Sequence, residues 1–268
     1  MEIYKKCLWI GSIFLLGCWG CKKKEEPVHT PETKPPVVEV GTRKLIPVQL
    51  GTGKSKVILN YTLQLAIQKI TNEDGRAIVI TYDQTGKPIE LERFKNEEPV
   101  SGTSYELDEK GRVITGTTYK IKGSSYMQTG IYELDYNKEN QVIKISYFDI
   151  NNRKIAEQEK SYNHTGSLTI EKGITSSSNY DYDLKTGLFK QISYLWLLQL
   201  EKENNLFPSG MNLFLSGVNN IQLCNNLLSP NMQQSFSYIF NKDGYPETIN
   251  ATIDGVKSAV KVTYQEIK

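Results

Sequence analysis

The sequence has 268 residues, 23% of them charged, and a formal net charge of +2 at pH 7. Such a balance gives no basic face or stripe, so we expect no nucleic-acid partner. With two histidines and four cysteines, the chain lacks the residues for a histidine-based metal site or for a Ser–His or Cys–His pair, and we expect no metal, no cofactor and no catalytic residue of that kind.

The first 17 residues have the form of a signal peptide. Lys5 and Lys6 supply a short cationic start, and Cys7 to Leu16 form an apolar run too short to span a bilayer as a permanent helix. Residues 15–18, Leu15-Leu16-Gly17-Cys18, resemble the bacterial lipobox. That resemblance implies cleavage after Gly17 and lipidation of Cys18.

Cys21 is the alternative lipidation site, although its upstream specificity position carries a cysteine instead of a leucine. Residues 18–47 are rich in proline and charge and lack apolar periodicity, which predicts a lipidated, disordered tether. The domain then comprises residues 48–268, and Cys224 is its one cysteine, so no disulfide can form there. We expect that thiol to serve in packing.

The domain begins with strict alternation of apolar and polar residues. Val57, Leu59, Tyr61, Leu63, Leu65 and Ile67 share one parity, which predicts a single half-buried strand. A turn motif then recurs, with Asp or Asn first and Gly or Asn fourth. Its copies are 72–75, 83–86, 108–111, 137–140, 149–152, 163–166 and 241–244, with a longer variant at 183–187. Asp and Asn bond the backbone two residues on, and Gly and Asn tolerate positive φ, so each copy predicts a hairpin.

The copies stop between about residues 195 and 234. We expect a long insertion there, with one short helix near 209–216 that packs over a sheet end or face and forms the wall of any pocket. Val260, Val262 and Tyr264 alternate with polar residues as a last strand. Together these features predict an all-β fold, an antiparallel meander of repeated hairpins with one long insertion carrying a short helix.

The lipobox, the lysine-rich tether, the hairpin repeats and above all the segment FSYIFNKDGYPETI (236–249) resemble Bacteroidetes-type cell-envelope lipoproteins of an uncharacterised domain family. The repeats are more loosely similar to the Tyr-Asp repeats of Rhs-type proteins. The resemblance covers about residues 55–268. It implies a lipoprotein anchored at the outer membrane, periplasmic or surface-exposed, and implies no catalytic residues.

Two local motifs resemble chemical sites. Residues 51–55 (GTGKS) end like a phosphate-binding loop but lack its first glycine, and a strand follows. Asn179, Asp181 and Asp183 have the opening spacing of a calcium loop, but Leu184 stands at its glycine position. We interpret both as ordinary turn or strand residues.

Paired carboxylates and abundant tyrosines leave two further interpretations open. Glu90/Glu92 and Glu157/Glu159 each lie on one strand face and could serve glycoside hydrolysis. The tyrosines could form a sugar-stacking platform, or they could pack across strands. We expect a non-catalytic binding or structural module with membrane lipid as one partner and a glycan or an envelope protein as another. The alternatives are an envelope glycan-processing hydrolase and a subunit of a larger envelope complex.

Overall fold

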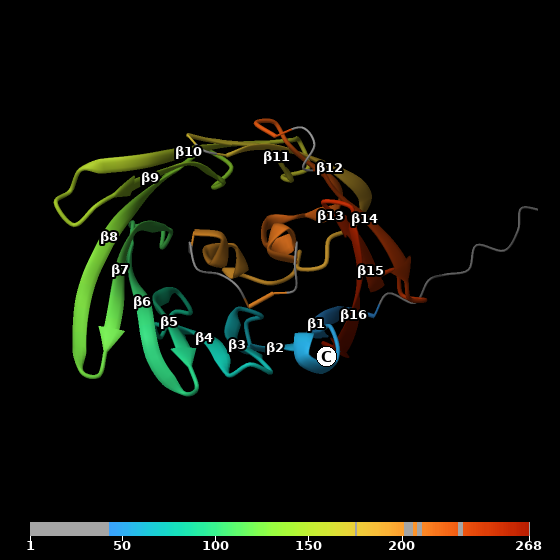
Figure 1. Cartoon of the computed structure of the whole chain (residues 1–268), viewed down its shortest axis with the longest axis horizontal. Coiled ribbons are helices and arrows are strands. Elements are labelled where there is room, and N and C mark those ends of the chain that lie inside the picture. Colours follow the sequence, from blue (N-terminus) through green and yellow to red (C-terminus); the bar gives the residue numbers. More distant parts are fainter. Residues whose placement is uncertain (1–42, 175, 201–205, 208–210, 230–232, 268) are drawn as a thin grey trace, which may run out of the picture. The chain divides into compact units, whose positions relative to one another are not determined.

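The computed structural model describes residues 43–174, 176–200, 206–207, 211–229 and 233–267. They belong to one compact unit, Val40–Lys268. Sixteen antiparallel strands follow one another in chain order and close into a barrel (Figure 1). The predicted all-β meander is therefore confirmed. What the alternation alone did not indicate is that the sheet closes on itself.

The strands have the following bounds: β1 Leu45–Leu50, β2 Val57–Tyr61, β3 Ile67–Asn72, β4 Arg76–Tyr82, β5 Pro88–Lys95, β6 Glu98–Leu107, β7 Val113–Lys122, β8 Ser125–Tyr136, β9 Val142–Phe148, β10 Lys154–Tyr162, β11 Leu168–Gly173, β12 Ser177–Thr186, β13 Asn219–Asn226, β14 Gln233–Phe240, β15 Pro246–Ile253 and β16 Val256–Glu266. Three short 3-10 helices accompany them: η1 Gly53–Ser55, η2 Leu195–Leu200 and η3 Met211–Ser216.

Closure joins the first strand to the last. β1 pairs with β16 from Leu45↔Glu266 to Leu50↔Val262, and its other edge pairs with β2. An ion pair between Arg43 and Asp243 lies beside this seam. β1 begins at Leu45, so the folded domain includes three residues that composition had assigned to the tether.

The repeated turns have the predicted geometry. In the copy at 108–112, the amide of Gly111 donates to the carbonyl of Asp108 and the amide of Asp108 donates to the carbonyl of Arg112. The Asp108 carboxylate also accepts from the amides of Lys110 and Arg112. Asn140 and Asn152 take positive φ, 60° and 59°, where other copies carry glycine. The hairpin prediction is thus confirmed at these copies, including those without glycine. It is wrong for the longer variant at 183–187, because residues 183–186 belong to β12 and the next strand, β13, begins at Asn219.

The first predicted strand is wrong in one respect. The chain leaves β2 at Tyr61, turns through residues 62–66 and returns as β3 from Ile67. Leu65 takes positive φ, 60°, and Leu63 is fully exposed. The turn has the same hydrogen bonds as the Asp/Asn copies, but Thr62 provides the side-chain acceptor. Alternating leucines concealed it because the turn preserves the parity of the pattern.

The insertion runs from 187 to 218, and we call its described residues (187–200, 206–207 and 211–218) the plug. The expected range of 195–234 was wrong at its C-terminal side, because Asn219–Asn226 and Gln233–Phe240 are strands. The plug carries η2 and η3 and lies inside the ring of strands instead of over a sheet end or face (Figure 1). Its apolar side chains include Leu197, Leu198, Phe214 and Leu215. They share one core with the inward-facing residues of the strands.

A belt of tyrosines surrounds the plug at one rim of the barrel. This is the rim that carries the Asp/Asn turns at the ends of the even-numbered strands. Each hydroxyl donates to a backbone carbonyl of the preceding strand, as Tyr136 does to Val113 (2.6 Å) and Tyr162 to Val142 (2.9 Å). The other donors of this kind are Tyr61, Tyr82, Tyr238 and Tyr264. The rings pack against the core, so these tyrosines confirm the packing interpretation. We call this end the tyrosine rim.

The expected signal peptide (1–17), the candidate lipidation sites Cys18 and Cys21, and the tether up to residue 42 lie outside the described residues. Within the described ranges, no helix has the length and hydropathy needed to cross a membrane.

Candidate functional site

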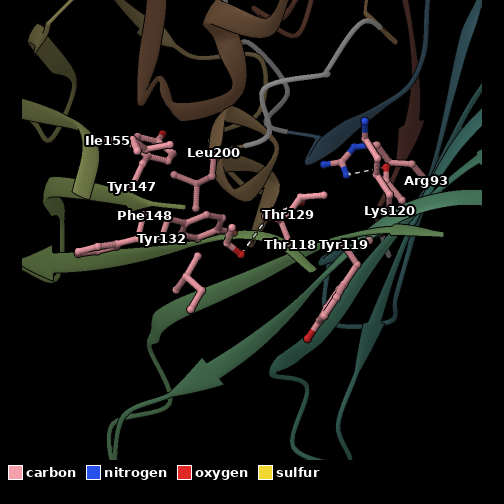
Figure 2. Close-up of a pocket in the computed structure, with 14 residues that line it drawn as sticks. Arg93, Thr118, Tyr119, Lys120, Thr129, Tyr132, Tyr147, Phe148, Ile155 and Leu200 are labelled. Carbon is pink, nitrogen blue, oxygen red and sulfur yellow. Dashed lines mark hydrogen bonds between the residues drawn. The ribbon is translucent and has the colours of Figure 1, made fainter. Parts of the chain in front are cut away.

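A cavity of about 220 Å³ lies against the inner wall of β5 to β10, with Leu200 of the plug in its lining. Leu200, the last described residue of η2, projects over this cavity (Figure 2). Arg93 and Lys120 lie near the C-terminal ends of β5 and β7, so the cavity lies toward the rim opposite the tyrosine rim. We call it the chamber. Residues 201–205 follow Leu200 and lie outside the described part of the chain.

One wall of the chamber is polar. Arg93 Nη1 donates to the hydroxyl of Ser101 (3.2 Å), and the hydroxyls of Thr118 and Thr129 lie 2.9 Å apart. Lys120 continues this wall (Figure 2). No carboxylate occurs among the described residues that line the chamber.

The facing wall is apolar and aromatic. Tyr132, Tyr147, Phe148, Ile155 and Leu200 line it, and the rings of Tyr132 and Tyr147 meet edge to face with centroids 6.2 Å apart. β8 carries Gly130 here, and β9 approaches it so closely that an added Cβ would lie 2.7 Å from the carbonyl oxygen of Phe148. A polar, cationic wall opposite an apolar one can hold a small amphipathic molecule in a fixed orientation.

The thiol of Cys224 lies in the barrel wall and is buried. Burial raises its pKa to about 11, so the thiol stays protonated at neutral pH. A protonated, buried thiol is a packing group and not a nucleophile, in line with the role expected for it.

The paired carboxylates lie on the outer face of the barrel. Leu91 between Glu90 and Glu92 is fully buried, which turns both glutamates outward. Burial, and to a smaller extent repulsion from Glu92, raises the pKa of Glu90. Glu157 pairs with Lys154, whose hydrogen bond lowers the pKa of Glu157. The structure brings neither pair into the chamber.

The two loop-like motifs have local structural roles. Residues 51–55 make a tight turn with η1 before β2. The Asp183 carboxylate accepts from the amide of Lys185 and from the side chain of Asn220. No group of three His, Cys, Asp or Glu side chains suited to a metal ion occurs among the described residues.

No protein-family model matches this sequence, and no curated protein matches it. Among solved structures, a porin-like protein from Bacteroides uniformis aligns with 83% of this chain and 98% of its own, at 12% identity and a TM-score of 0.41. The Tc holotoxin pore of Photorhabdus luminescens aligns with 79% of this chain at 13% identity and a TM-score of 0.22, and a TcdB2–TccC3 complex does so with a TM-score of 0.21. This chain spans about a tenth of those toxin chains. Likeness at this level identifies neither a family nor an activity.

The residues of the chamber were not found from the sequence. They come from six strands and the plug, and each reads locally as an ordinary strand residue. The signal that could have pointed to them is the pair of glycines in adjacent long strands, Gly116 in β7 and Gly130 in β8, because a strand glycine marks a close approach or a space.

Proposed function

We propose that this chain is a lipoprotein of the cell envelope, anchored through Cys18 at the outer membrane, whose barrel is a non-catalytic binding module. The ligand is a small amphipathic molecule held in the chamber. The observation that carries the proposal is a cavity against the inner wall whose described lining has a polar, cationic side and an apolar, aromatic side.

The outer surface of the barrel supports the proposal of a water-exposed domain that is held at the membrane by an anchor. Along β16, Val260 and Val262 are buried, whereas Lys261, Thr263 and Gln265 between and after them are exposed. A barrel whose strands face lipid carries the reverse pattern, with apolar side chains outward and polar ones inward. This pattern on β16, apolar inward and polar outward, favours attachment by acylation at the N-terminus.

The chemistry of the lumen supports binding instead of catalysis. The carboxylate pairs face outward, and the buried thiol is protonated. The chamber offers hydroxyl groups, an ammonium, a guanidinium and aromatic rings, which orient a ligand without activating a nucleophile.

Thr129 provides the test because it is exposed and lines the chamber. Thr129→Trp should fill the chamber at little cost in stability. Lipophilic extracts of the envelope, incubated with the purified protein and analysed by native mass spectrometry, should yield a bound molecule in the parent chain and none in this variant. Lys242→Trp, at an exposed turn of the tyrosine rim, is the matched control and should retain the molecule.

Equal loading of both tryptophan variants would place any bound molecule outside the chamber and refute this assignment. A complementary experiment is affinity capture from the envelope. The bait should begin upstream of Leu45, because β1 starts there.

A further inference from the structure

A second cavity, of about 240 Å³, lies between the plug and the inner wall at the tyrosine rim, and we call it the plug cavity. Its apolar lining includes four aromatic side chains: Tyr136, Tyr162, Phe189 and Trp196. Its polar lining includes two ammonium groups, on Lys160 and Lys190. No carboxylate occurs among the described lining residues.

Lys160 is the feature that ordinary packing does not explain. Its side chain is only 6% exposed, which carries a large desolvation cost for a charged group. Its Nζ lies 3.3 Å from a carboxylate oxygen of Glu171 and 3.5 Å from Oε1 of Gln199 in the plug. An ammonium has three N–H donors. Two of them have these partners, and Lys160 lines the cavity, so the remaining donor can serve a ligand there.

We propose that the plug cavity is a binding site for a small aromatic monocarboxylate, with the carboxylate on Lys160 and the ring among Tyr162, Phe189 and Trp196. Among the described residues, Glu171 offsets the charge of Lys160, and Lys190 adds a second positive charge to the lining. The volume suits a single ring with a short acid side chain. Among the described lining residues this site shares Leu200 alone with the chamber, and it does not depend on the ligand proposed there.

Trp196 makes the proposal directly measurable. The other tryptophans are Trp9 and Trp19, so the full chain carrying Trp9→Phe and Trp19→Phe has one indole, which lines the cavity. Phenylacetate should change the Trp196 fluorescence saturably, with a Kd below about 1 mM for a ligand of this size. Benzyl alcohol, which lacks the charge, should bind at least about tenfold more weakly, and benzylammonium should not bind.

Two variants locate the site. Lys160→Met should weaken phenylacetate binding at least about tenfold, equivalent to losing one charge-assisted hydrogen bond. Because that change leaves Glu171 without its partner, Lys160→Met/Glu171→Met provides a second variant that removes both charges. Lys120→Met, in the chamber, should leave phenylacetate affinity unchanged.

The chain without substitutions in the cavity tests the proposal even if both cavity variants fold poorly. The absence of a saturable Trp196 response to phenylacetate would overturn the proposal, as would equal affinity for the three probes. Loss of binding in Lys120→Met alone would move the ligand to the chamber and overturn the plug-cavity site, while leaving the proposed function of the chamber intact.

Discussion

Gly116 occupies a position in β7 that a larger residue cannot share with its neighbour in β8. It pairs with Tyr105 on one side and Tyr132 on the other. An added Cβ would lie 2.2 Å from Cζ of Tyr132 and 2.5 Å from its hydroxyl oxygen. Tyr132 is 1% exposed and packs edge to face on Tyr147, so its ring cannot move away without displacing other core groups.

Gly116→Ala should therefore destabilise the barrel by about 1–3 kcal/mol, the usual cost of overpacking a core. For a domain of this size that corresponds to a melting temperature lower by about 3–10 °C. Thermal and urea unfolding followed by circular dichroism measure both quantities. Gly173→Ala is the matched control, because an added Cβ there meets its nearest atoms at an ordinary 3.4 Å.

A double-mutant cycle with Tyr132→Leu separates this clash from other effects. If the ring causes the loss, Gly116→Ala should cost little once the ring is gone, with a coupling energy above about 1 kcal/mol. Additive costs within about 0.5 kcal/mol would refute the reasoning, as would a melting temperature of Gly116→Ala equal to that of Gly173→Ala.

Four further predictions concern the turns, acid stability, the thiol and the anchor. Gly111→Val should lower the melting temperature, since a β-branched residue at φ 74° is strained by about 1–3 kcal/mol; an unchanged value would contradict the turn's role. Backbone amides lower the pKa of Asp108 in the folded chain. Its contribution to the free energy of unfolding is therefore present above its unfolded pKa, about 4, and is lost as pH falls through the lower folded value. Asp108→Asn keeps the acceptor, so its free energy of unfolding should fall less steeply with decreasing pH in acid titrations. The raised pKa of Cys224 should make thiol labelling at pH 8 about 100-fold slower in the native chain than in denaturant, and equal rates would show an accessible thiolate. Cys18→Ala should abolish lipidation and Cys21→Ala should not, as mass spectrometry of the mature N-terminus after labelling with a fatty-acid analogue will show; a lipidated peptide starting at Cys21 would move the cleavage site.

Local chemistry was readable from the sequence because it acts over a few residues. The Asp/Asn-x-x-Gly/Asn copies contain both the side-chain acceptor and the residue that tolerates positive φ, so the hairpins followed without knowledge of the fold. The same reasoning failed at 62–66, where Thr62 and Leu65 perform those roles with residue types that rarely do so. The inert role of Cys224 also followed from the inventory of residues.

The tertiary structure decided what depends on closure. Pairing of Leu50 with Val262 joins residues more than 200 positions apart, and no local pattern encodes it. Once the barrel closes, the only apolar volume left for the plug is the lumen, which is why η2 and η3 lie inside. The chamber and the plug cavity are the space that this packing leaves, so Lys120 and Lys160 acquire their settings only after strands and plug have come together.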